Sequence, residues 1–339
     1  MARVIVARFA WLLVLAAGVS AGAQEPGPRV AEPSQGTEEA EEPGPRVAEP
    51  SQGTEEAAPS QSEKKPSPTE RSVLDRLCAT LSQEEDPDGP INTDRPTFTP
   101  SYAVVPRGRV QFESGFTFNN EPTSVSRTTL YDLPELAMRI GLFNRVELRT
   151  FWLGQTWTQT QSRPGGPWRL GGGLSDMEVG FKWQLLKADK EKKWIPTTGL
   201  ITSIYAPTGG TSVLGSHTVE PYVNLIYAWS LTDKLTLSGS TGYLGMRVTD
   251  LGPGRPAESF QRYHQSLVAF FSVNKRTTLF YEWYVLTFTN AVDNRPTHYM
   301  DGGILYLLTP NMQLDLRAGF GLSGHPNDFF TGAGYSVRF

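Results

Sequence analysis

The last stretch of the chain, Asn311 to Phe339, contains two runs that alternate between two kinds of residue. The first run places apolar residues at every second position: Met312, Leu314, Leu316, Ala318, Phe320 and Leu322. After a short polar break the alternation resumes and continues to the final residue: Phe329, Thr331, Ala333, Tyr335, Val337 and Phe339. A period of two residues indicates β-strands with one apolar and one polar face. The stretch therefore predicts two such strands.

The chain also stops on an aromatic residue at the end of a strand. Tyr335, Val337 and Phe339 occupy the fifth-last, third-last and last positions. Bacterial outer-membrane barrels commonly end with apolar or aromatic residues at these positions, and their strands face lipid with every second residue. We therefore predict an all-β transmembrane, antiparallel, up-and-down β-barrel, with these three residues as its membrane-insertion signal.

The connections between alternating runs are of two lengths. Five are short turns: 141–145, 187–193, 230–234, 272–276 and 308–311. Six are mostly rich in Gly and Pro, and most of these are longer: 119–127, 158–172, 206–216, 249–258, 289–295 and 323–328. Short turns on one side and longer loops on the other are typical of outer-membrane barrels. Eleven connections predict about twelve strands, and an even number puts both ends of the barrel on the periplasmic side.

Composition excludes several other classes of protein. Beyond the N-terminus no apolar run reaches the ~18 residues of a transmembrane helix. Cys78 is the only cysteine, so no disulfide framework or metal-thiolate site is expected. The net charge of −4 comes without a basic patch, so nucleic acid is not an expected partner. His217, His298 and His325 lack metal-ligand spacing, and we expect neither a metal nor a cofactor.

The N-terminal third has a different character from the rest. Residues 1–23 have a positive end, an apolar stretch and an A-x-A cleavage site, as secretory signal peptides do. Residues 24–70 contain two tandem copies of a Pro-, Glu- and Ser-rich segment, which predicts a disordered periplasmic linker. We assign 71–106 to a pre-barrel segment with a short helix near 72–81, and 107–339 to the barrel. These features predict an outer-membrane protein of a Gram-negative-type bacterium.

Strand alternation directs many charged residues into the lumen. The candidates for a solute path are Glu113, Arg139, Arg149, Glu178, Lys182, Glu282, Asp315 and Arg317. Opposed charge rows could sort solutes by their electric field. The same charges could instead neutralise one another and fill a narrow barrel with salt bridges. Both interpretations stay open at this point.

Two further residues precede the first alternating run. Asp94 and Arg95 could fold into the periplasmic mouth and pair with lumen charges, as a plug does. A plain turn, with Pro96 fixing the backbone, is the alternative.

An enzymatic function is not expected. His264 and Ser266 are two residues apart and share one strand face, as a His-x-Ser pair does in barrels that hydrolyse outer-membrane lipid. Two such common residues also arise at this spacing as polar lumen lining. We therefore assign no catalytic residues.

Several segments resemble one known family in their order and spacing. They are 92–99 (NTDRPTFT), 105–115 (VPRGRVQFESG), 133–142 (LPELAMRIGL), 174–185 (LSDMEVGFKWQL), 205–210 (YAPTGG), 312–322 and 328–339. The region 91–339 is similar to the outer-membrane transporters named for the meta-cleavage pathway of phenol degradation. The resemblance implies a barrel with a transport role, and its link to phenol rests on genomic context. The tandem repeat departs from the usual pattern.

Together these features predict a barrel for passive transport of small, hydrophobic or aromatic, molecules. A closed barrel with a structural or interaction role in the envelope is the alternative, followed by a lipid hydrolase. The expected partners are outer-membrane lipids and the barrel-assembly machinery, which would read the C-terminal strand. The solute is not identified by the sequence.

Overall fold

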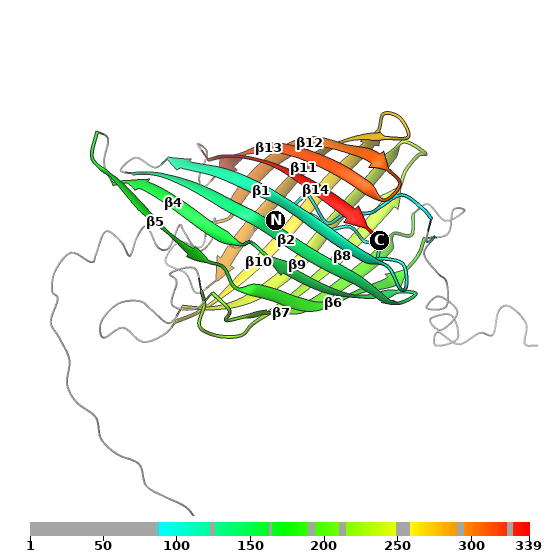
Figure 1. The fold of residues 1–339 in the computed structure, drawn as a ribbon, viewed down its shortest axis with the longest axis horizontal. Coiled ribbons are helices and arrows are strands. Elements are labelled where there is room, and N and C mark those ends of the chain that lie inside the picture. Colours follow the sequence, from blue (N-terminus) through cyan, green and yellow to red (C-terminus); the bar gives the residue numbers. More distant parts are fainter. Residues whose placement is uncertain are drawn as a thin grey trace, which may run out of the picture.

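The protein is a β-barrel closed by antiparallel strands (Figure 1). The computed structural model describes residues 86, 88–122, 126–162, 165–188, 194–209, 215–248, 258–289, 295–323 and 328–339. The predicted signal peptide, linker and short helix near 72–81 lie outside these residues. No helix in the described ranges is long and apolar enough to cross a membrane.

In the part of the chain that the structure describes, fourteen strands make up the sheet, and neighbours in sequence are mostly neighbours in space. They are β1 (Val110–Pro122), β2 (Arg127–Phe143), β3 (Val146–Trp152), β4 (Gln155–Gln161), β5 (Trp168–Leu174), β6 (Met177–Leu186), β7 (Thr197–Ala206), β8 (Glu220–Ser230), β9 (Leu235–Val248), β10 (Glu258–Ser272), β11 (Thr277–Thr289), β12 (Thr297–Thr309), β13 (Met312–Ser323) and β14 (Phe329–Arg338). Pairing of β1 with both β2 and β14 closes the barrel.

The prediction of twelve barrel strands is confirmed, because two of the barrel strands are each divided by a short break. β3 and β4 both pair with β2, one with each half of its length. β5 and β6 pair with β4 and β3 in the same way. Residues 153–154 and 175–176 form the two breaks. The outer halves, β4 and β5, extend as a hairpin beyond the neighbouring strands (Figure 1).

Two of the predicted loops are shorter than the sequence suggested. The segment 158–172 was expected to be a loop, yet β4 continues to Gln161 and β5 starts at Trp168. Likewise β1 reaches Pro122 and β2 starts at Arg127, inside the expected loop 119–127. These strands were not predicted because glycine and proline do not favour a strand on their own. Pairing with a neighbouring strand nevertheless holds both segments in an extended conformation here.

The predicted facing of the strands holds throughout the described barrel. On β13, Leu316 and Phe320 are 53% and 50% exposed, while Asp315 and Arg317 between them are buried. On β6, Phe181 and Trp183 are exposed and Lys182 is fully buried. An apolar outer surface of this extent fits contact with lipid rather than water. The interior is consequently the polar side of the molecule.

Candidate functional site: a segment inside the barrel and the cavity beside it

Residues 90–106, here called the inserted segment, lie inside the barrel lumen. The segment passes the β12–β13 turn, where the Ile91 N–H donates to Pro310 O over 2.7 Å. It leaves beside β2, where the Gly108 N–H donates to Gly141 O over 2.8 Å. Both contacts lie at the end of the barrel that carries the short turns. Every residue from Asp94 to Pro100 is buried.

The inserted segment has no regular structure because its prolines lack the N–H groups that strand pairing requires. Barrel carboxylates bind its remaining N–H groups instead. Glu113 accepts hydrogen bonds from Asp94 N at 2.9 Å and Arg95 N at 3.0 Å. Glu282 accepts from Phe98 N at 2.5 Å and Thr99 N at 2.6 Å. Charged acceptors make such bonds stronger than neutral ones, so the segment is held along its length.

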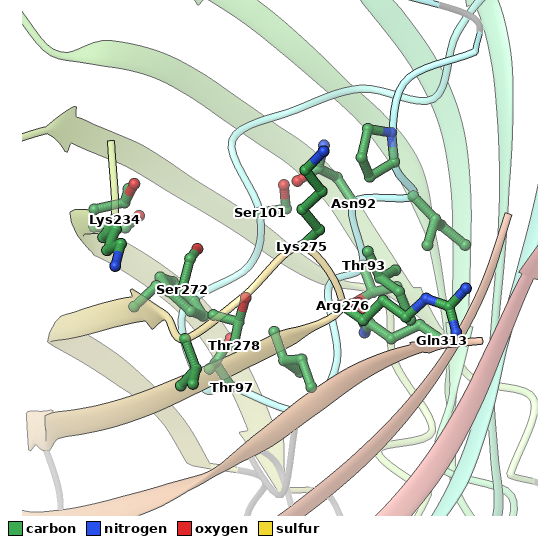
Figure 2. A pocket seen from close by; sticks show the side chains of 18 of the residues that line it. Asn92, Thr93, Thr97, Ser101, Lys234, Ser272, Lys275, Arg276, Thr278 and Gln313 are labelled. Atoms are coloured by element: carbon green, nitrogen blue, oxygen red, sulfur yellow. Dashed lines mark hydrogen bonds between the residues drawn. The ribbon is translucent and has the colours of Figure 1, made fainter. Parts of the chain in front are cut away.

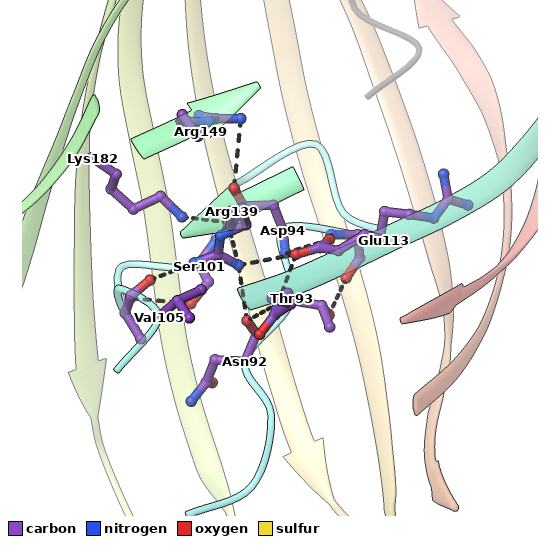
Figure 3. A network of polar contacts seen from close by, with 12 residues as sticks. Asn92, Thr93, Asp94, Ser101, Val105, Glu113, Arg139, Arg149 and Lys182 are labelled. Atoms are coloured by element: carbon purple, nitrogen blue, oxygen red, sulfur yellow. Dashed lines mark hydrogen bonds and ion pairs between the residues drawn. The ribbon is translucent and has the colours of Figure 1, made fainter. Parts of the chain in front are cut away.

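Asp94 is the centre of a buried ionic network (Figure 3). Lys182 Nζ lies 2.5 Å from its carboxylate, and Arg149 and Arg139 lie at 3.5 and 3.6 Å. Burial on its own would raise the pKa of Asp94, but the three cations hold this pKa well below its ordinary value. A depressed pKa means that the carboxylate stabilises the docked state at any pH above about 4, and the contribution is lost only in stronger acid.

Arg95 lies across the strands that close the barrel. Its guanidinium pairs with Glu135 of β2 and with Asp315 of β13, the latter at 3.3 Å. It also donates to Ala333 O of β14 at 3.1 Å. Gly115 and Gly334 face each other on β1 and β14, and a Cβ at either position would overlap the Arg95 side chain. These two glycines therefore provide the space that Arg95 occupies.

All eight predicted lumen charges are buried around this segment. Seven contact it directly: Glu113, Arg139, Arg149, Lys182, Glu282, Asp315 and Arg317. The eighth, Glu178, lies 3.6 Å from Arg149. Their role in a solute path stays a prediction. Sequence reasoning missed Gly115 and Gly334, although glycines at inward positions of alternating strands signal a close approach of another group.

A cavity of about 580 Å³ lies beside the inserted segment (Figure 2). One wall is the segment itself, from Pro90 to Tyr102. The other wall comes from strands β9–β13 and two turns, and includes Lys234, Ser272, Lys275, Arg276, Thr278 and Gln313. None of the eight predicted lumen charges lines it. The turn residues place the mouth of the cavity at the same end at which the segment is inserted.

His264 and Ser266 are neighbours on β10 but have different hydrogen-bond partners. His264 Nε2 lies 3.1 Å from Asn224 Oδ1. Ser266 Oγ lies 2.8 Å from Ser240 Oγ and 2.7 Å from Thr99 Oγ1. This geometry does not show the base-to-nucleophile hydrogen bond of a serine hydrolase. Within the described ranges, no cluster of three or more His, Cys, Asp or Glu is arranged to hold a metal.

The C-terminal strand β14 completes the barrel wall. Tyr335 and Phe339 are exposed on the outer surface, and the ring of Phe339 meets that of Phe112 edge to face at 6.3 Å. β14 pairs with β13 on one side and β1 on the other.

Comparison with known structures gives the class of the barrel. The outer membrane channel from Pseudomonas putida F1 matches with a TM-score of 0.57 at 14% identity, covering 72% of this chain and 100% of that one. The translocator domain of autotransporter NalP from Neisseria meningitidis gives 0.44 at 12% identity, covering 78% and 94%. The KdgM porin gives 0.39 at 12% identity, covering 66% and 99%. No curated protein sequence matches. At such identities the likeness concerns the fold, which is that of an outer-membrane barrel.

A sequence model for the family described as "Putative MetA-pathway of phenol degradation" matches residues 93–339. The match covers most of the inserted segment as well as the whole barrel. The chain therefore belongs to this family of outer-membrane barrels, as its motifs predicted.

Proposed function

We propose that this protein is a passive outer-membrane channel for small molecules, narrowed by the inserted segment. The cavity beside the segment is the observation that carries the proposal. It extends from the turns at Lys234 and Lys275 inward to Thr97 and Ser238. In a barrel with a purely structural role, we would expect a closely packed interior without a cavity of this size at the mouth.

The contacts of the inserted segment are unevenly distributed around the lumen. Its ion pairs connect it to β2, β3, β6 and β13. The cavity has charged residues in the turns at its mouth, Asp233, Lys234, Lys275 and Arg276. The strand residues of its wall carry hydroxyl and apolar groups instead, among them Ser238, Ser272, Thr278 and Phe270. Such a wall suits small solutes with little charge, because moving an ion past it offers no compensating charge. The solute path we propose therefore follows the cavity beside β9–β12, which none of the eight predicted lumen charges lines.

The orientation and partners follow from the same proposal. We place the short-turn end, the inserted segment and the N-terminal tail on the periplasmic side. The outer surface contacts lipid, and the assembly machinery reads Tyr335, Val337 and Phe339 on the last strand. We propose no catalytic role, since His264 and Ser266 have separate partners.

The alternative is a closed envelope barrel without transport. The buried ion pairs of Asp94 favour this alternative, because they hold the segment in place. Conductance of the folded protein in planar bilayers separates the two. We expect Asp94→Asn to raise the open fraction at least tenfold. Removing one partner of a buried ionic network costs about 3–5 kcal/mol, and this cost falls on the docked state.

Asp88→Asn is the matched control. Asp88 lies just before the inserted segment and forms an exposed pair with Arg109 at 3.7 Å. Exposed pairs contribute about 0–1 kcal/mol, so this variant should conduct like the wild type. Uptake of a neutral sugar into proteoliposomes provides a second readout. If folded Asp94→Asn protein neither conducts nor speeds uptake beyond empty vesicles, the closed barrel is the correct reading.

A further inference from the structure

A continuous row of aromatic rings crosses the lumen at the inner end of the inserted segment. In contact order, the row consists of Tyr205, Tyr222, His264, Phe98, Tyr284, Tyr299 and Phe330. Six of these rings belong to barrel strands, and all six project inward. Phe98 is the exception, because it belongs to the inserted segment. It lies in the middle of the row.

The ring of Phe98 is bound as a planar ligand would be. It stacks on Tyr284 with centroids 4.2 Å apart and an interplanar angle of 4°. Its other neighbour, His264, meets it edge to face at 5.2 Å and 85°. Only 2% of Phe98 is exposed, and it packs in one cluster with Leu286, Tyr299 and Phe330. Stacked and edge-to-face arrangements are the two that aromatic pairs prefer.

We propose that Phe98 occupies a binding slot for a single aromatic ring. When the inserted segment leaves the lumen, Tyr284 and His264 would present the same stacked and edge contacts to a solute. The segment then acts as an internal competitor, since its ring and the solute require the same space. This inference rests on the proposed channel function and names the class of solute.

The charges beside the slot select against anionic aromatics. Glu282 accepts the Phe98 N–H at 2.5 Å and lies directly opposite Asp301 in the β11–β12 register. The guanidinium of Arg317 lies over the Phe330 ring, 5.6 Å from its centroid, and donates to Pro96 O and Thr117 Oγ1, both at 2.8 Å. A carboxylate placed here would lie beside this pair of carboxyl groups in a buried region, where an unpaired charge is costly. The slot should therefore take a neutral ring and reject a benzoate-like one.

Binding of 4-fluorophenol, followed by fluorine NMR on the full-length protein in micelles, tests the proposal. We expect Phe98→Ala to bind the probe saturably and at least tenfold more tightly than the wild type, because the competing ring is gone. 4-Fluorobenzoate should bind at least tenfold more weakly than 4-fluorophenol to the same variant. Phe98→Leu retains an apolar anchor and serves as the second variant if Phe98→Ala fails to fold; it should also bind better than the wild type.

Phe151→Ala is the matched control. Phe151 is another inward, buried ring of the lumen, but it is packed in a different cluster. Its removal leaves a similar vacancy outside the slot, and binding should stay at the wild-type level. Equal affinity in the folded wild type and the Phe98 variants would overturn the inference, and so would a gain in affinity in Phe151→Ala as large as that in the Phe98 variants.

The two proposals can fail separately. Conductance without selective binding would support the proposed channel and refute the proposed slot. Binding in the Phe98 variants without conductance or uptake would support the proposed slot and refute the proposed channel.

Discussion

At the scale of single residues, glycine decides where a charge can be buried. Gly115 and Gly334 are opposite partners at the closure between β1 and β14, and Arg95 crosses both. Its main-chain N–H and its guanidinium together contact β1, β2, β13 and β14. A buried ion pair of this kind contributes little net stability, but it fixes one arrangement of the groups around it. The position of the inserted segment thus depends on residues that have no side chain.

Gly334→Ala should therefore release the inserted segment. The new Cβ would overlap Arg95 and lie 2.7 Å from Asp315 Oδ2. Overpacking of this kind costs about 1–3 kcal/mol, and ~1.4 kcal/mol corresponds to a factor of ten. The measurement is the rate of thiol labelling at Thr99→Cys in a Cys78→Ser background, since Thr99 is buried when the segment is docked. We expect an approximately tenfold faster rate.

Gly302→Ala is the control for this substitution. Gly302 lies on β12, and the nearest atom to a Cβ there would be Phe280 O at 3.0 Å, with nothing from the inserted segment nearby. Its labelling rate should equal that of the unmodified background. Equal rates for Gly334→Ala and Gly302→Ala would show that the glycine does not position Arg95.

At the scale of elements, the divided strands explain how a hairpin extends from the barrel. Gly154 has a φ of +74° in the break between β3 and β4, and a Cβ there would overlap Pro134 O of β2. β5 pairs only with β4, so its other edge lacks a partner strand within the described residues. The hairpin is therefore held by β2 and by the geometry of this one break.

Gly154→Ala should loosen the β4–β5 hairpin by about 1–3 kcal/mol, because it combines an unfavourable φ with a steric overlap. Amide hydrogen exchange across 155–161 and 168–174 measures the effect, and exchange in β8–β11 should not change. Gly165→Ala separates the two causes, since Gly165 has the same φ of +74° with no atom within 4 Å of a Cβ. If both variants exchange alike, the overlap with Pro134 has no effect.

The elements also show what the sequence could and could not predict. Alternation identified most of the strands, their facing and four of the five short turns, while the fifth, 187–193, lies partly outside the described residues. It could do so because lipid outside and charge inside impose a strict period of two. The hairpin escaped prediction since β5 is rich in glycine and has no alternation of its own. The eight lumen charges were assigned to the correct face. Their convergence on one segment could not be predicted. The alternation of a strand shows which face a residue lies on, but not its partner across the lumen.

At the scale of the whole molecule, the described residues fill the lumen from the end that carries the short turns. The inserted segment brings Asp94 and Arg95 to the barrel charges, and its aromatic tip reaches the row of rings beyond them. The cavity lies between the inserted segment and the wall formed by β9–β13. A barrel wall is rigid because every strand except β5 is paired on both sides, whereas the inserted segment is held mainly by contacts that involve side chains. Movement that opens a path should therefore occur in the segment and not in the wall.

A reversible crosslink between segment and wall tests this directly. Thr99 Oγ1 and Ser266 Oγ are 2.7 Å apart, so Thr99→Cys with Ser266→Cys in a Cys78→Ser background should form a disulfide between the segment tip and β10. We expect oxidation to reduce bilayer conductance at least tenfold and a reductant to restore it. Thr128→Cys with Thr160→Cys is the matched control, because these hydroxyls are 3.3 Å apart on β2 and β4 and do not involve the segment. Its oxidation should leave conductance unchanged. If the segment crosslink forms and conductance persists, solutes pass along the β9–β12 wall without any movement of the segment, and the segment is a fixed constriction rather than a gate.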